Sequence, residues 1–137
     1  MNPVLDVGLF KDKTPRGERF SVGSAEALLN GLARSNALVV RLYNLPDLYA
    51  AGVKYKREPR GSGESWKGIR QVMRDRYADC DDLSAARAGE LIATGADPGA
   101  RVLVYRTGAR TLHAVVARSD GRIEDPSRIL GMGRRYD

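Results

Sequence analysis

Residues 79–94 read DCDDLSAARAGELIAT, and this stretch sets the architecture that the rest of the chain has to complete. Apolar residues recur in it at helical spacing within an alanine-rich segment, which favours a helix with one buried face: Leu83, Ala86, Leu91 and Ile92. Aspartates in the first turn and a glycine just after the last turn are typical helix boundaries. The stretch therefore predicts a helix over residues 80–94 that begins at the only cysteine of the chain.

Downstream of this helix the hydrophobic period changes from 3.6 towards 2, which is typical of strands. RVLVYR (residues 101–106) and TLHAVVAR (residues 111–118) are two such runs, and the four residues between them suit a hairpin. Ser119-Asp120-Gly121 predicts a second turn, and residues 122–126 begin a third extended piece. The C-terminal part therefore predicts a small antiparallel meander.

Upstream of the central helix, leucines at spacings near three and four predict a core-facing helix over residues 24–44. It ends at Leu45-Pro46, because proline disfavours helix at the residue before it. Residues 64–76 predict a second, short helix from the spacing of Trp66, Ile69, Val72 and Met73. Residues 1–23 show no sustained period and are interpreted as an irregular arm, which leaves residues 24–137 as the folded domain.

The chain length and the element order together predict the fold class. With 137 residues and 42% apolar content the chain can bury one core, so a single domain is expected. Helices come first and an antiparallel meander follows, which favours an α+β fold over a parallel sheet. The helix that begins at Cys80 is expected to pack on the small sheet.

Composition excludes several classes of protein. One cysteine forms no internal disulfide and no multi-cysteine metal site. No run approaches the roughly 18 to 20 apolar residues of a membrane span, and no secretory signal is visible, so synthesis in the cytosol is expected.

The net charge of +6 favours anionic partners. The arginines are spread along the chain, which favours an ordinary solvated basic surface over a nucleic-acid interface.

The single cysteine and the single histidine lie where a cysteine hydrolase needs them. Cys80 starts a helix, where unpaired N–H groups and the helix dipole stabilise a thiolate and can bind a developing oxyanion. His113 lies inside a predicted strand, from which an imidazole can be aimed at the sulfur. If the last two extended runs pair, Asp125 or Glu124 comes near His113 and holds its tautomer.

The alternative for each residue is structural. A lone cysteine in an apolar setting is usually buried filler and a lone histidine in a strand is usually structural. Cys80 is instead flanked by Asp79, Asp81 and Asp82, which suits a site more than a core. Three carboxylates beside a thiol should raise its pKa, so the aspartates are expected to point away, capping the helix or binding a cation.

The segment Asp79-Cys80-Asp81-Asp82-Leu83, followed by Ala85-Ala86, resembles the motif around the nucleophile of bacterial transglutaminase-like cysteine peptidases, within the papain-related fold. The longer sequence of roughly residues 24–132, which includes HAVVARSDGRIEDPSRILGM, is similar to small transglutaminase-like proteins of tailed bacteriophages and prophages. Two departures are mild: Ala78 replaces the usual Gly before the Asp, and Asp81 replaces the usual Glu.

The resemblance implies a transglutaminase-like fold with a catalytic triad of Cys80, His113 and Asp125. Some relatives bind calcium beside the nucleophile, which makes Asp79, Asp81 and Asp82 candidate calcium ligands, although a calcium site needs about six or more oxygens and no defined loop supplies them. No other cofactor is expected.

Two functions follow as expectations. The first is a phage-encoded cysteine hydrolase or acyltransferase that works through a thioester acyl-enzyme on a peptide or protein substrate. The second is a virion structural or assembly protein that keeps the fold without catalysis and binds other phage structural proteins. The expected location is the cytoplasm of the bacterial host or the virion itself, with neither a membrane nor nucleic acid as partner.

Overall fold

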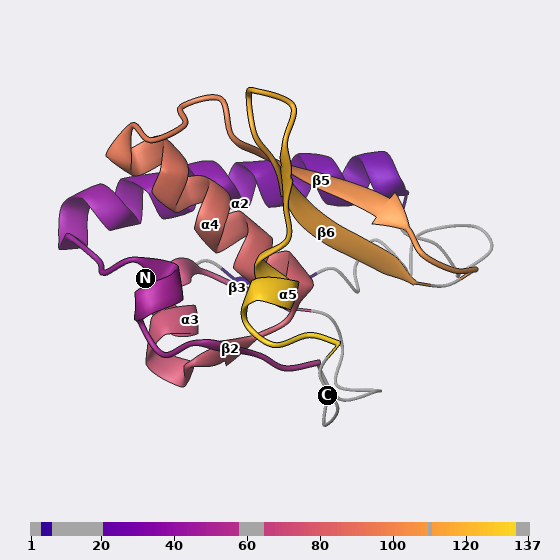
Figure 1. The fold of residues 1–137 in the computed structure, drawn as a ribbon, viewed down its shortest axis with the longest axis horizontal. Coiled ribbons are helices and arrows are strands. Elements are labelled where there is room, and N and C mark those ends of the chain that lie inside the picture. The colour runs from indigo at the N-terminus through magenta and orange to yellow at the C-terminus, as the bar shows by residue number, and fades with distance from the viewer. Residues whose placement is uncertain (1–3, 7–20, 58–64, 110, 134–137) are drawn as a thin grey trace.

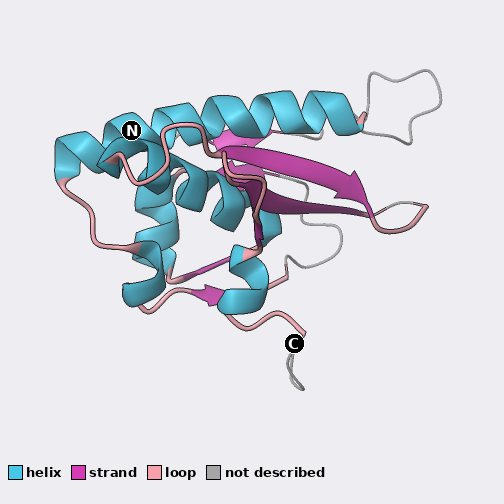
Figure 2. Ribbon diagram, turned by 45° about the horizontal axis from the view of Figure 1, so that its top comes forward, coloured by secondary structure: helices cyan, strands magenta, loops and turns pink. Residues whose placement is uncertain are grey.

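The structure is a computed structural model that describes residues 4–6, 21–57, 65–109 and 111–133. Its main layer pair consists of two helices against one three-stranded sheet (Figures 1 and 2). The helices are α2 (Val22–Tyr43) and α4 (Cys80–Thr94). The sheet is antiparallel in the order β5 (Arg101–Arg106), β6 (Leu112–Ala117) and β7 (Ile123–Glu124). The fold class is therefore mixed α+β with a small sheet, as the sequence predicts.

Shorter elements complete the fold, and most of them contact α4. One antiparallel pair joins β1 (Val4–Asp6) to β3 (Ser65–Lys67). A parallel pair joins β2 (Lys54–Tyr55) to β4 (Tyr77–Ala78). The remaining elements are the 3-10 helix η1 (Leu48–Ala50), α3 (Ile69–Asp75) and α5 (Pro126–Ile129).

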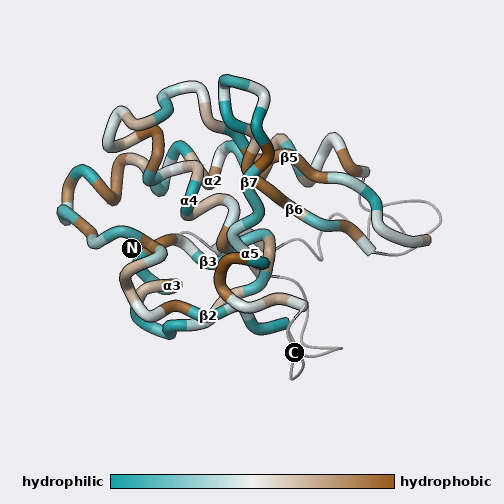
Figure 3. Tube along the Cα trace, viewed as in Figure 1, coloured by the Kyte–Doolittle hydropathy of each residue, from teal (hydrophilic) through white to brown (hydrophobic). Residues whose placement is uncertain are grey.

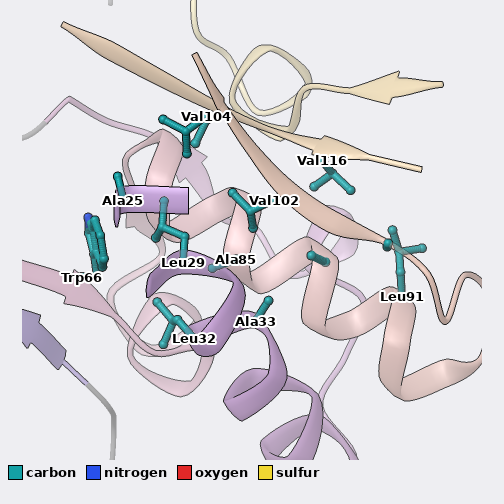
Figure 4. Close-up of a cluster of buried hydrophobic side chains, with 13 residues drawn as sticks. Ala25, Leu29, Leu32, Ala33, Trp66, Ala85, Leu91, Val102, Val104 and Val116 are labelled. Carbon is teal, nitrogen blue, oxygen red and sulfur yellow. The ribbon is translucent and has the colours of Figure 1, made fainter. Parts of the chain in front are cut away.

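Two clusters of buried side chains hold these elements together. The first lies between α2, α4 and the sheet (Figure 4) and includes Leu29, Trp66, Leu91, Val102 and Val116. The second lies where α4 meets α3, η1 and α5, and includes Leu48, Ile69, Val72, Leu83 and Leu130. Hydropathy along the chain follows this division, since β5 and β6 are hydrophobic where they pack and the turn between β6 and β7 is hydrophilic (Figure 3). Helix α4 thus contributes to both clusters, which explains its high alanine content.

The boundaries of the predicted helices are partly confirmed. Helix α4 covers the predicted residues, with Asp79 as its N-cap and Gly95 in the left-handed conformation at its C-cap. Helix α2 begins at Val22, two residues earlier than predicted, because the hydroxyl of Ser21 accepts a hydrogen bond from the Ser24 N–H and caps the helix there. Both helices thus follow local capping signals.

Two predictions are wrong where pairing overrides local pattern. Residues 65–67 form strand β3 and not the first turn of a helix, so Trp66 lies in a strand. The predicted irregular arm contains strand β1, which pairs with β3 in the register Leu5 to Trp66. Its last three residues, 21–23, cap and begin α2, and residues 1–3 and 7–20 lie outside the described residues. Helical spacing of a few apolar residues cannot exclude a strand whose partner is far away in the chain.

Within the described part of the chain, no helix combines the length and the apolar character required to cross a membrane.

Candidate functional site

Cys80 is the first residue of helix α4. The helix begins there because Asp79 is extended and its side chain accepts a hydrogen bond from the Asp82 N–H at 3.4 Å. The backbone oxygen of Asp79 accepts the first helical hydrogen bond, from the Leu83 N–H. The thiol is half-buried and packs against the first core cluster. The prediction that the cysteine lies at a helix N-terminus is thus confirmed.

The Asp81 carboxylate lies beside the thiol. Its Oδ1 is 3.6 Å from the Cys80 sulfur, and its Oδ2 accepts a hydrogen bond from the Trp66 indole at 2.9 Å. The indole therefore fixes the carboxylate against the thiol. The expectation that the aspartates point away is wrong for Asp81, because β3 brings Trp66 across the start of α4.

Burial raises the pKa of the Cys80 thiol, and the negative charges of Asp81 and Asp79 raise the pKa further. The backbone N–H of Ala114 acts in the opposite direction and does not outweigh them. The thiol pKa therefore lies well above its ordinary value. At neutral pH the resting group is a neutral thiol, because its charged form is disfavoured by both desolvation and like charge.

Asp82 has a structural position. It is fully buried, and its Oδ1 accepts a hydrogen bond from the backbone N–H of Lys67 at 2.7 Å, which ties β3 to α4. Burial raises the pKa of Asp82, and the charge of Asp79 adds to this. Within the described residues, no group of three or more histidine, cysteine or acidic side chains is arranged to hold a metal ion. The three aspartates thus cap the helix, face the thiol and anchor β3, each in a separate role.

His113 and Asp125 come together as a pair. His113 lies on the central strand β6 opposite Tyr105 of β5, and the Tyr105 ring meets the imidazole edge-on at 5.6 Å between ring centres. The imidazole Nε2 lies 2.8 Å from Asp125 Oδ2, and both side chains are largely buried. The other carboxylate oxygen, Oδ1, accepts the N–H groups of Ser127 and Arg128 and so caps α5. Asp125 therefore links the histidine to a helix start.

Strand β6 brings this pair next to the start of α4. The Ser84 hydroxyl of α4 donates to the carbonyl of Ala114 at 3.0 Å, and the N–H of Ala114 influences the Cys80 thiol. Ala114 directly follows His113, so the cysteine and the histidine lie on adjoining segments. Between the described residues, however, no hydrogen bond joins Cys80 to His113, and the thiol instead interacts with Asp81. Nε2 faces Asp125, so Nδ1 is the ring nitrogen that this pair does not engage.

Glu124 does not lie against His113, although the sequence left it open as the partner. Its carboxylate accepts from Arg87 at 2.6 Å, from Arg118 at 2.8 Å and from the hydroxyl of Tyr49. Burial raises the pKa of Glu124, but the hydrogen bonds from Tyr49 and Arg87 outweigh burial and leave the pKa below its ordinary value. This cluster was not predicted, because its members are scattered over the sequence and no local pattern joins them.

The raised thiol pKa predicts the pH dependence of alkylation. Iodoacetamide should modify Cys80 with a midpoint above that of an ordinary cysteine, because only the thiolate reacts. Asp81→Asn removes a charge beside the sulfur, so the midpoint should fall and the rate at mildly alkaline pH should rise several-fold. The measurement is the alkylation rate against pH, with Asp120→Asn on an exposed turn as the matched control. An unchanged midpoint in Asp81→Asn would show that Asp81 does not influence the thiol.

Comparisons of the chain with protein-family models, with curated proteins and with solved structures found no match.

Proposed function

We propose that this protein is a cysteine hydrolase or acyltransferase that forms a thioester on Cys80, with His113 as base and Asp125 as the residue that orients it. One observation carries the proposal. His113, on the strand that adjoins the N-terminal part of the helix bearing Cys80, forms a largely buried pair with Asp125 at 2.8 Å. A nucleophile, a base and a third group that orients the base are the parts that such catalysis requires.

The chemistry follows from the contacts. A carboxylate at Nε2 can only accept, so neutral His113 carries its proton on Nε2 and presents Nδ1 as the acceptor. Because the raised pKa keeps the thiol neutral at rest, the proton leaves Cys80 for Nδ1 as the sulfur attacks a carbonyl. The leaving group departs with that proton, and a thioester remains. Water then completes hydrolysis, or an amine completes transfer.

The resemblance noted in the sequence extends the proposal to origin and substrate. We propose a transglutaminase-like fold encoded by a tailed phage or prophage, acting in the bacterial cytoplasm or on the virion. A peptide bond, a glutamine amide and a peptidoglycan stem peptide are the acyl donors that fit this chemistry. The mixed α+β architecture with Cys80 at a helix start is consistent with that proposal.

The test uses 4-nitrophenyl acetate, an activated ester that reports acylation without knowledge of the natural substrate. Loss of labelling in Cys80→Ala alone would prove little, because the chain has one cysteine. The informative comparison is between folded chain and chain unfolded in urea. Without catalysis the folded thiol should react more slowly, because its pKa is raised. Catalysis predicts that the folded chain reacts faster, by about 10²-fold or more, with Cys80→Ala as the blank.

A second candidate is a binding or assembly role without catalysis, and one observation favours it: among the described residues the thiol contacts the Asp81 carboxylate and makes no hydrogen bond to His113. In that case the folded chain acylates no faster than the unfolded chain. The same experiment therefore decides between the two functions.

A further inference from the structure

An ion pair connects the helix that carries Cys80 to the segment that carries Asp125. Arg87 lies seven residues after Cys80 on α4, two helical turns along the axis. Its Nε lies 2.6 Å from Oε2 of Glu124, which directly precedes Asp125. Both side chains are only 15% exposed. A short ion pair that is shielded from solvent stabilises the contact between its two segments more than an exposed surface pair does.

The Glu124 carboxylate receives donors from three separate parts of the chain. Arg87 of α4 and the Tyr49 hydroxyl of η1 both donate to Oε2, and Arg118, which directly follows β6, donates to Oε1 at 2.8 Å. Arg87 also lies over the Tyr49 ring, 4.6 Å from its centre. A second carboxylate, that of Glu90, holds the other end of the Arg87 guanidinium at 2.6 Å. The position of Glu124 is therefore determined from several directions.

The backbone pairing of this segment with the sheet is short. Strand β7 has two residues, and its pairing with β6 is limited to Val116 with Glu124 and Ala117 with Ile123. Helix α5, which begins directly after Asp125, has four residues. Short elements of this kind supply weak restraint on their own. The chain after Asp125 is held by Leu130, which is buried in the second core cluster, and the side-chain contacts of Glu124 hold the residue just before Asp125.

We propose that Arg87 and Glu124 are positioning residues: their ion pair locks the Cys80 helix to the Asp125 segment and so keeps Asp125 on Nε2 of His113. The inference rests on the proposed function for its catalytic meaning. The positioning itself concerns only the arrangement of His113 and Asp125, and it is measurable whether or not the thiol turns over.

The measurement is the tautomer of neutral His113, read from its ring nitrogen resonances in correlated proton–nitrogen spectra. The chain has one histidine, so these signals have no competitor. With Asp125 in place the Nε2–H tautomer should dominate. Arg87→Met and Glu124→Gln should both yield a mixture of tautomers and slow the acylation by 4-nitrophenyl acetate by about tenfold or more, up to about 100-fold.

The two variants make opposite changes in charge. If charge alone mattered, the two variants would shift the imidazole tautomers in opposite directions. Displacement of Asp125 shifts the tautomers in the same direction in both variants. Arg122→Met and Asp120→Asn are the matched controls, because these residues form an exposed ion pair in the turn that leads to β7. Both controls should retain the parental tautomer and the parental rate.

If Arg87→Met or Glu124→Gln does not fold, Tyr49→Phe provides a milder change, since it removes one donor from Glu124 and keeps the ring under Arg87. It should shift the tautomers in the same direction by a smaller amount. Folded variants that keep the parental tautomer would overturn the proposal and leave the ion pair with a purely structural role. A parent chain that acylates no faster folded than unfolded would instead overturn the proposed function, with the tautomer result still standing.

Discussion

Acylation of Cys80 by 4-nitrophenyl acetate is expected to fall by about 10²–10⁴-fold when His113 is replaced by glutamine. Glutamine keeps a polar side chain on β6 but cannot take the proton of the thiol. The measurement is the rate of 4-nitrophenolate release in the first turnover. Unassisted attack would require the thiolate, which burial and the two aspartates disfavour, so little activity should remain without the base.

Asp125 offers a matched pair of variants for the same experiment. Asp125→Asn removes the negative charge beside His113. It retains an N-cap for α5, because asparagine caps a helix about as well as aspartate. Asp125→Ala loses both. A large, similar loss of rate in both variants would assign the effect to the histidine partner. A loss confined to Asp125→Ala would assign the effect to the N-cap of α5. An unchanged acylation rate in His113→Gln would contradict the role of His113 as the base.

The largest expected effect on stability is at Gly89, where α4 crosses α2. A Cβ at this position would lie 2.6 Å from the Asn36 Cβ and 2.7 Å from the backbone oxygen of Ala33. Neither atom belongs to a flexible side-chain end, so the two helices would have to separate. Asn36 is fully buried and accepts the Ile69 N–H at 3.0 Å, and separation would strain this contact at the start of α3.

Gly89→Ala should therefore lower the free energy of unfolding by about 2 kcal/mol. Overpacking costs typically 1–3 kcal/mol, occasionally more, and the better helix propensity of alanine returns at most about 1 kcal/mol. The matched control is Gly31→Ala in α2, where an added Cβ meets nothing within 4 Å and should stabilise the fold by about 0.5–1 kcal/mol. Denaturant unfolding measures both. A Gly89→Ala chain as stable as the parent would show that the helices can move apart freely.

Some parts of the site could be predicted because their signals are local. A capping aspartate, an aspartate-rich first turn and a terminal glycine define α4 within residues 79–95, and therefore place Cys80 at a helix start. The hairpin of β5 and β6 is similar, since its two strands are separated by a short turn. The meander also limits the expected partner of His113 to Asp125 or Glu124, because one more turn returns the chain to the same strand, and the structure pairs His113 with Asp125.

Other parts could not be predicted because they depend on contacts between distant segments. Trp66 has helical spacing to its neighbours, yet pairing with β1 makes it a strand residue whose indole holds Asp81 against the thiol. The contact of Arg87 with Glu124 spans 37 positions of sequence, and no periodicity carries information about it. Burial of the thiol, which raises its pKa, is likewise a property of the packed core.

The amino-acid sequence by itself determined the helix that begins at Cys80, the hairpin that carries His113 and the return of the chain to Asp125, because each depends on residues within a few turns of one another. Only the tertiary structure decided that Asp81 faces the sulfur and that Glu124 pairs with Arg87 rather than with His113. Both outcomes depend on which segments pack together, and packing is set by the burial of surfaces that lie far apart in the chain.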